Sequence, residues 1–325
     1  MTLVAVLPGL NAAEHQPHAL HSPERIWVEK NCYADLWIEL LHAQGMEPHA
    51  SLAFVVALDF LGDQWTFFKP PLGDLRSLYG IDVQELTVWR PLVEHAAEHL
   101  GSGRLLSLEV DAFWLPDTAG TDYRHAHTKT TIVLNEIDTT ARRLGYFHNA
   151  GYFELQGEDF GQLLAIDAPP ALLPPYAEVI HIDRAQQRSD ADLRARSAAL
   201  LDSHLAWRRA SNPVARFRER FEADLPALQQ SGLAAYHHWA FAGVRQLGAA
   251  FELAALYLRW LRPAARDAAT DFELIAEHSK TLILKAARAV NSGRALDASE
   301  LFDEMIAAWD RGMAAGVGVI RSTPR

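Results

Sequence analysis

The sequence is almost without cysteine: Cys32 is the only one in 325 residues. A single thiol cannot form an internal disulfide, which suits a reducing compartment. No apolar run approaches the roughly 18 residues of a membrane span. The N-terminus lacks a basic stretch and meets Pro8 and Gly9 too early for a signal peptide. We therefore expect a cytoplasmic protein without a membrane partner.

Basic residues are also few, with 30 Lys and Arg against 41 Asp and Glu, for a formal charge of −11. Because nonspecific nucleic-acid binding needs a basic surface, we expect no nucleic-acid partner. Residues 184–220 differ, since they carry nine arginines and four acidic residues. This segment is either a solvated helix face with i,i+4 ion pairs or a docking surface for an acidic partner or a phosphate group.

Hydrophobic residues make up 49% and charged residues 22% of the chain, as is typical of globular proteins with a sizeable core. The first half mixes helical and strand-like patterns, and residues 128–137 and 144–148 predict an antiparallel hairpin. The second half shows helical spacing in five stretches: 191–210, 213–230, 233–261, 271–290 and 298–314. We predict an α+β domain over 1–168, a linker marked by prolines 169–170 and 174–175, and an all-helical subdomain over 176–325.

Cys32 falls in the first turn of a predicted helix that runs to His42. The free N–H groups of a helix N-terminus favour negative charge and so stabilise a thiolate, the nucleophilic form of cysteine. The alternative is a small buried hydrophobic residue, since unpaired cysteines are commonly buried. Cys32 becomes a candidate nucleophile only if a histidine and an orienting group accompany it.

The candidate bases are His125 and His127, which precede a predicted strand. His127 directly adjoins the strand and is preferred, although His125 stays open. Asn149 falls at the end of the return strand of the hairpin, where its amide would orient the imidazole. The order Cys, His, Asn is that of papain-like enzymes. The His-x-His spacing also permits a metal, but no third ligand is evident, so we expect no metal site.

Two resemblances extend this interpretation. Asn31-Cys32-Tyr33 on a helix, the segment 108–116, a histidine opening the next strand and Asn149 together resemble the papain-like acyltransferases typified by the butirosin biosynthesis N-terminal domain. That resemblance covers roughly residues 25–165. Segments 62–70 and 245–254 resemble DUF1839, a bacterial family of unknown function, and this second resemblance covers nearly the whole chain.

The butirosin-type resemblance implies a papain-like fold in the N-terminal half, a Cys32 nucleophile and a histidine base. It also implies a reaction: an acyl group leaves a carrier-protein thioester, forms an acyl-cysteine and passes to an amine. That family usually has Asp as the third member, so Asn149 is a departure that leaves Asp111 and Asp138 as rival orienting groups. The DUF1839 resemblance implies an association with amino-acid:carrier-protein ligase pathways, and hence an aminoacyl thioester as donor.

We therefore predict a cysteine-dependent acyltransferase with Cys32, His127 and Asn149 as catalytic residues. Its partners are an acyl or peptidyl carrier protein, which would dock on 184–220 and supply its phosphopantetheine arm, and a small amine acceptor; no other cofactor is expected. The predicted substrate-binding residues are Trp65, Asp111, Trp114, Tyr123, Arg124 and His125. One alternative is a cysteine hydrolase with the same triad, and another is a non-catalytic binding protein on a papain-like scaffold.

Overall fold

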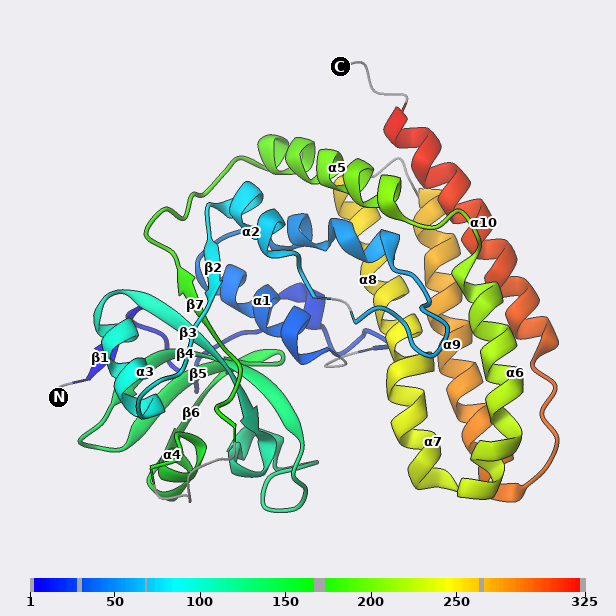
Figure 1. Ribbon diagram of the computed structural model, residues 1–325. Coiled ribbons are helices and arrows are strands. Elements are labelled where there is room, and N and C mark those ends of the chain that lie inside the picture. Colours follow the sequence, from blue (N-terminus) through cyan, green and yellow to red (C-terminus); the bar gives the residue numbers. More distant parts are fainter. Residues whose placement is uncertain (1–2, 28–30, 68, 167–172, 263–265, 322–325) are drawn as a thin grey trace. The chain divides into compact units, whose positions relative to one another are not determined.

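A computed structural model describes residues 3–27, 31–67, 69–166, 173–262 and 266–321. The chain forms two compact units, whose elements can be followed in Figure 1. The sheet unit consists of residues 1–21, 32–48 and 71–188, and the helical unit of residues 22–31, 49–70 and 189–325. This division differs from the predicted segments 1–168 and 176–325 in two ways. Two short stretches of the first half belong to the helical unit, and residues 176–188, predicted as part of an all-helical subdomain, belong to the sheet unit and contain a strand. Prolines 169–170 of the predicted linker lie outside the described residues.

The sheet unit is built on an antiparallel sheet of order β2-β7-β3-β4-β5-β6, with β1 pairing with β4. The strands are β1 (Val4–Ala5), β2 (Asp82–Glu85), β3 (Arg104–Asp111), β4 (Lys129–Asp138), β5 (Arg143–His148), β6 (Gly151–Gln156) and β7 (Ala177–His181). The helices are α1 (Cys32–Ala43), α2 (Leu72–Tyr79), α3 (Leu92–Gly101) and α4 (Glu158–Leu163), with the 3-10 turns η1 (Ala19–His21), η3 (Ala112–Trp114) and η4 (Pro116–Thr118). The α+β class and the β4–β5 hairpin are confirmed.

The two faces of the sheet are covered by different helices. On one face, α3 packs on apolar side chains of β3 and β4, including Val110 and Ile132. Val110 pairs with Thr130 across β3 and β4, and the next pair along is Asp111 with Lys129. Because successive side chains of a strand alternate between faces, Asp111 and Lys129 point to the opposite face from Val110.

That opposite face is the one on which α1 lies, since α1 contacts β4, β5 and β6. Phe147 follows Tyr146, which belongs to the α3 core, so Phe147 points to the other side. The ring of His15 lies 6.4 Å from the ring of Phe147, and its Nε2 is 2.8 Å from Glu39 Oε2 on α1. Helix α1, which begins at Cys32, therefore shares a sheet face with Asp111.

The helical unit contains α5 (Asp190–Trp207), α6 (Pro213–Ser231), α7 (Leu233–Ala240), α8 (Gln246–Leu261), α9 (Arg266–Ser292) and α10 (Ser299–Arg321). The predicted helices are confirmed, except that the expected helix over 233–261 is interrupted by a π-helical turn, η5 (Phe241–Arg245). A 3-10 helix, η2 (Pro48–Ala57), precedes the loop that enters this unit's core.

The two short stretches from the first half are bound to α8 and α6. Glu252 on α8 accepts hydrogen bonds from the backbone N–H groups of Ile26 (2.8 Å) and Trp27 (2.9 Å). The Trp27 ring lies so close to Gly248 that a Cβ there would be 2.3 Å from it. Only glycine allows this approach, which explains why residues 22–27 are part of the helical core.

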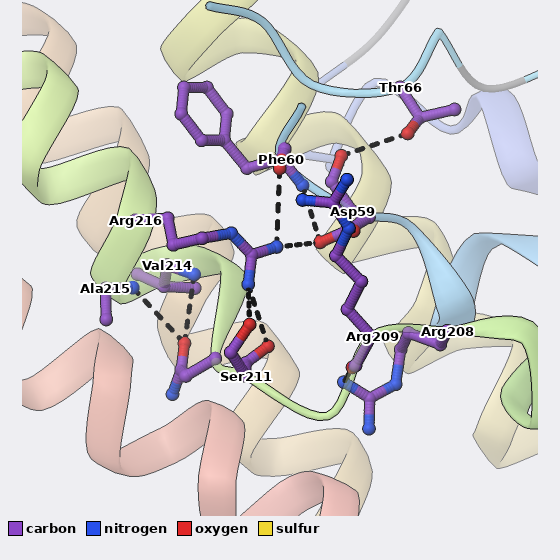
Figure 2. Close-up of polar contacts among 10 residues, drawn as sticks. Asp59, Phe60, Thr66, Arg208, Arg209, Ser211, Val214, Ala215 and Arg216 are labelled. Carbon is purple, nitrogen blue, oxygen red and sulfur yellow. Dashed lines mark hydrogen bonds and ion pairs between the residues drawn. The ribbon is translucent and has the colours of Figure 1, made fainter. Parts of the chain in front are cut away.

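Arg216 fixes the loop after η2 to the start of α6, as Figure 2 shows. Its guanidinium forms an ion pair with Asp59 and donates to the Phe60 carbonyl at 3.3 Å. Asn212 caps α6 by accepting from the N–H of Val214 at 2.9 Å, and Thr66 Oγ1 donates to the Asp59 carbonyl at 3.0 Å. These bonds hold the 59–66 loop in place and position Trp65 in the core.

Candidate active site

Cys32 is the first residue of α1, as the sequence predicts, and its side chain is partly buried. Its position exposes it to the free N–H groups of the first helical turn. Within the described part of the chain, Cys32 has no hydrogen bond to His125, to His127 or to Asn149. The thiol and the candidate base are therefore placed on one face of the sheet without being in direct contact.

His127 has an orienting carboxylate, and that carboxylate is Asp111. His127 Nδ1 lies 2.6 Å from Asp111 Oδ2, while Asp111 Oδ1 accepts the backbone N–H of Phe113 at 3.1 Å. The imidazole also stacks on the Phe113 ring, with centroids 4.5 Å apart and 13° between the planes. In the neutral ring, donation from Nδ1 to the carboxylate leaves the lone pair on Nε2, on the far side of the ring from Asp111. The His127 side chain is 72% exposed, so Nε2 can reach a substrate.

Asn149 does not orient His127, which corrects the prediction from the sequence. It lies in the turn between β5 and β6, where His148 pairs with Gly151, and its backbone has φ 45°. The prediction assumed that the strand continues through Asn149, but β5 ends one residue earlier. Asp138 is also excluded as the orienting group, because it caps the β4–β5 turn by accepting from the N–H groups of Thr140 and Ala141.

His125 is exposed and lies in a turn, with its N–H donating to the Asp122 carbonyl at 2.8 Å. Its ring has no hydrogen bond within the described residues. Of the two histidines that the sequence leaves open, His127 is therefore the one with an orienting carboxylate. A base without such a partner would not keep one tautomer and orientation.

Tyr123, Arg124 and Trp114 form one cluster beside His127. Arg124 donates to Asp159 at 2.6 Å, Tyr123 Oη donates to the same carboxyl at 3.0 Å, and the guanidinium lies 4.4 Å from the Trp114 ring centroid. The guanidinium carbon of Arg124 also lies 6.0 Å from the centroid of the Phe113 ring, and the same ring stacks on His127. Phe113 thus connects this cluster to the base, and the prediction missed it although it adjoins Trp114.

Trp65, in contrast, is not a substrate-binding residue of this site. It is 2% exposed and belongs to the core of the helical unit. Its ring centroid lies 5.6 Å from Phe60, 5.8 Å from Phe217 and 6.2 Å from Phe251. Trp65 is a packing residue because all of its apolar surface is already covered.

The first turn of α1 is anchored by a buried carboxylate. Glu178 on β7 is fully buried and accepts from Tyr33 Oη at 2.7 Å and Tyr176 Oη at 2.9 Å. Burial and the adjacent Glu178 charge raise the pKa of Tyr33 well above its usual range, and they raise the pKa of Tyr176 to about 12. Both phenols therefore stay protonated and donate to Glu178, and the bond from Tyr33 holds the start of α1.

The anchor and the partner of the base are connected through β3. Glu178 on β7 pairs with Ser107 on β3, and Asp111 lies four residues further along β3, about 13 Å from Ser107. Glu109 lies between them and accepts from Lys129 Nζ at 2.7 Å. The face of the sheet that α1 covers therefore carries a polar row that leads from the first turn of α1 to His127.

A second His–Asp pair was missed by the sequence analysis. His148 Nδ1 is 2.5 Å from Asp117 Oδ2, and His148 Nε2 is 2.8 Å from Thr130 Oγ1. Tyr146 Oη donates to the other Asp117 oxygen at 2.6 Å. Thr130 pairs with Val110, so this chain lies on the α3 face, opposite α1. The side chains of His148 and Asp117 are 1% and 4% exposed, so solvent hardly reaches them.

A third histidine cluster joins the N-terminal segment to α1. His21 lies between Glu39 Oε1 (2.5 Å) and Asp35 Oδ1 (3.3 Å). Burial alone would lower the pKa of His21, but the hydrogen bonds to Asp35 and Glu39 outweigh it and raise the pKa to about 9. Burial likewise opposes ionisation of Glu39, but hydrogen bonds from His15 and His21 lower its pKa to about 2. This cluster is a buried ion pair that fixes residues 15–21.

The arginine-rich segment is partly explained by ion pairs within helices. Three of its arginines bind an acidic residue four positions away: Arg196 with Asp192, Arg218 with Glu222 and Arg220 with Asp224. The first of these pairs is in α5 and the other two are in α6. These arginines fit the solvated-face interpretation of 184–220, and docking of a carrier protein there stays a prediction.

Comparison with known protein families shows which family the chain belongs to. The DUF1839 N-terminal domain matches residues 16–182 and the DUF1839 C-terminal domain matches residues 190–316, so the chain belongs to the DUF1839 family. No curated protein matches it. None of the described helices combines the length and apolar character needed to cross a membrane.

Proposed function

We propose that this DUF1839 protein moves an acyl or aminoacyl group from a carrier-protein thioester to an amine through an acyl-cysteine at Cys32. The observation that carries the proposal is the 2.6 Å contact between His127 Nδ1 and Asp111, which leaves Nε2 as a proton acceptor. The start of α1 lies on the same sheet face and the thiol is partly buried, and the reaction requires the thiol and His127 Nε2 to approach each other when the donor binds.

In the first step, the Cys32 thiolate attacks the thioester carbonyl, and the carrier thiol leaves with a proton from the His127 imidazolium. In the second step, the amine nitrogen attacks the acyl-cysteine and gives a proton to His127 Nε2, and the C–S bond breaks so that Cys32 leaves as a thiolate beside the imidazolium. The N–H groups of the first turn of α1 would stabilise the oxyanion in both steps. Asp111 keeps the neutral imidazole in one tautomer between the two steps and stabilises the imidazolium that is present before the first step and after the second.

Within this proposal, the donor brings its own phosphopantetheine arm and no other cofactor takes part. The papain-like fold of the sheet unit belongs to the same proposal, and its support is the helix that begins at Cys32 and lies on an antiparallel sheet. We place the reaction in the cytoplasm, because an unpaired nucleophilic thiol persists best in a reducing compartment.

The direct test is to incubate the protein with an aminoacyl-loaded carrier and measure intact mass. We expect an adduct of the acyl mass on the wild type and none on Cys32→Ala. The matched control is His238→Gln, which changes an exposed histidine on α7 of the helical unit and should acylate normally. If no donor in a panel of acyl and aminoacyl carriers modifies Cys32, the transfer proposal is wrong.

Hydrolysis by the same residues is the second candidate, and the exposure of His127 favours it because water can reach Nε2. Product analysis with and without added amines separates the two activities. A yield of free acid that added amines do not reduce would assign a hydrolase. A third outcome would support a non-catalytic binding protein. Iodoacetamide would then alkylate Cys32 slowly in the folded protein, and the rate would reach that of the denatured protein only after unfolding.

A further inference from the structure

The sheet unit has a polar cavity of about 650 Å³, whose lining contains neither Cys32 nor His127 and includes the first two arginines of segment 184–220. It lies among the end of α2, the start of β2, the end of β7 and the chain that follows β7. It is lined by Arg76, Gly80, Asp82, His181, Asp183, Arg184, Gln186 and Arg188. The volume is in the range of small-molecule sites, but the lining is polar, so an apolar ligand does not suit it.

The wall of this cavity is fixed by the C-terminus of α2. The last carbonyls of a helix have no partner within it. Here Tyr79 O accepts from the N–H of Gln186 at 2.8 Å, and Leu78 O accepts from Arg188 Nε at 2.7 Å. Segment 182–188 therefore completes α2, and the Arg188 guanidinium is held at the cavity wall.

Gly80 allows this close packing. It has φ 73°, in the left-handed region that favours glycine, and a Cβ there would lie 2.3 Å from the Arg184 carbonyl oxygen. Any other residue would push the segment away from α2. The placement of Arg184 and Arg188 beside the cavity thus depends on one glycine.

The charges of the lining favour an anion. Arg76 is neutralised by its ion pair with Asp82, and its hydrogen bond to Asp82 lowers the pKa of that carboxyl. Arg184 is exposed and, within the described part of the chain, has no hydrogen bond or ion pair. By residue type, the lining carries three arginines (76, 184 and 188) against Asp82 and Asp183, which gives it a formal charge of +1. A cavity of net positive charge in a chain of charge −11 marks a site for an anionic ligand.

We propose that this cavity binds a phosphorylated small molecule, with the phosphate held by Arg184 and Arg188. The guanidinium group carries planar pairs of N–H donors that match phosphate oxygens, and arginine is the residue type best suited to such binding. His181 and Gln186 offer further polar contacts for the rest of the ligand. This site does not depend on Cys32 or on the acyl-transfer proposal.

The test is isothermal titration of the whole protein with three probes: pyrophosphate, ADP and phosphopantetheine. We expect saturable binding of at least one probe, weakened by added salt because the contacts are ionic. Tighter binding of phosphopantetheine than of the others would identify a carrier arm as the source of the phosphate. Tighter binding of ADP would identify a nucleotide. Absence of saturable binding by all three probes overturns the proposal.

Two variants and one control make the assignment specific. Arg184→Gln removes an exposed side chain that has no partner among the described residues. It should weaken binding about tenfold, as expected for the loss of a charge-assisted hydrogen bond. Gly80→Ala should weaken binding without removing a charge, because it displaces segment 182–188.

The control is Arg288→Gln, which changes an exposed arginine on α9 and should bind like wild type. Equal affinity of Arg184→Gln and Arg288→Gln would show nonspecific attraction and refute the site. Cys32→Ala should bind normally, which separates this result from the acyl-transfer test.

Discussion

The sheet carries two His–Asp pairs with similar local geometry and opposite surroundings. In both pairs the histidine Nδ1 lies within 2.6 Å of an aspartate oxygen. His127 is 72% exposed and its Nε2 is available, whereas His148 is 1% exposed and its Nε2 is bonded to Thr130. A His–Asp contact alone therefore does not identify a base. What distinguishes the two is the second ring nitrogen, which a catalytic histidine must keep available for substrate.

The largest expected effect is on chemistry at the exposed pair. His127→Gln removes the proton acceptor and should lower the rate of Cys32 acylation by about 10²–10⁴-fold, the usual range for a general base. Single-turnover acylation followed by intact mass measures it. His148→Phe serves as the comparison, since that residue lies on the other face of the sheet. If His148→Phe lowers the rate as much as His127→Gln in folded protein, the assignment of His127 as the base fails.

The next largest effect is expected on the free energy of unfolding when the buried pair of His148 and Asp117 is broken. His148→Phe keeps an aromatic ring but leaves the Asp117 carboxylate buried with Tyr146 as a remaining donor. Breaking a buried pair by removing one partner costs about 3–5 kcal/mol. Urea denaturation should show a loss of that size in the free energy of unfolding. His127→Phe should change it by less than about 1 kcal/mol, because exposed ion pairs contribute little; equal losses would contradict the comparison.

The cluster of His21 with Glu39 extends the comparison to a histidine held between two carboxylates. Its pKa of about 9 lies above the ordinary value of 6.5, so the stability it contributes is complete below pH 6.5 and is lost as pH rises through 9. The pKa of Glu39, about 2 against an ordinary 4.5, implies a contribution that is complete above pH 4.5 and is lost as pH falls through 2.

His21→Gln should therefore destabilise the protein most between pH 4.5 and 6.5, by an amount on the order of 3 kcal/mol. The difference from wild type should shrink toward pH 9. Urea denaturation at pH 5.5, 7.5 and 9 measures it, with His125→Gln as an exposed control whose effect should not vary in this way. A His21→Gln difference that is constant over this range would show that His21 is not held as a cation.

The sequence predicted those helices and turns of the structure that depend only on residues close together in the chain. The helix from Cys32 and the hairpin of β4 and β5 follow from periodicity and turn residues within a few positions. The partner of His127 could not be predicted from such local patterns. It depends on where β5 ends and on Asp111 of β3, 16 residues before the histidine. A one-residue difference in the hairpin moved Asn149 from the predicted strand end into a turn.

Residues whose role depends on distant segments could not be placed from the sequence. Trp65 lies next to charged and polar residues in the chain, yet it packs on Phe217, which belongs to a helix far along the sequence. Asp117 precedes His148 by 31 residues and reaches it from a 3-10 turn. No spacing rule connects them, so the buried pair was not predicted. Of the exposed pair, His127 was predicted from its place before a strand, whereas Asp111 was only a rival to Asn149 as its orienting group.

The smallest effect is expected where the buried pair ends in Thr130. Thr130→Val keeps the branched shape and removes the hydroxyl that lies 2.8 Å from His148 Nε2. It should lower the free energy of unfolding by about 1–2 kcal/mol, since a buried ring nitrogen loses its partner. Combined with His148→Phe, the two losses should be less than additive, because the partner is already gone. Full additivity in a double-mutant cycle by urea denaturation would show that Thr130 and His148 do not interact, and that the second ring nitrogen does not distinguish the two pairs.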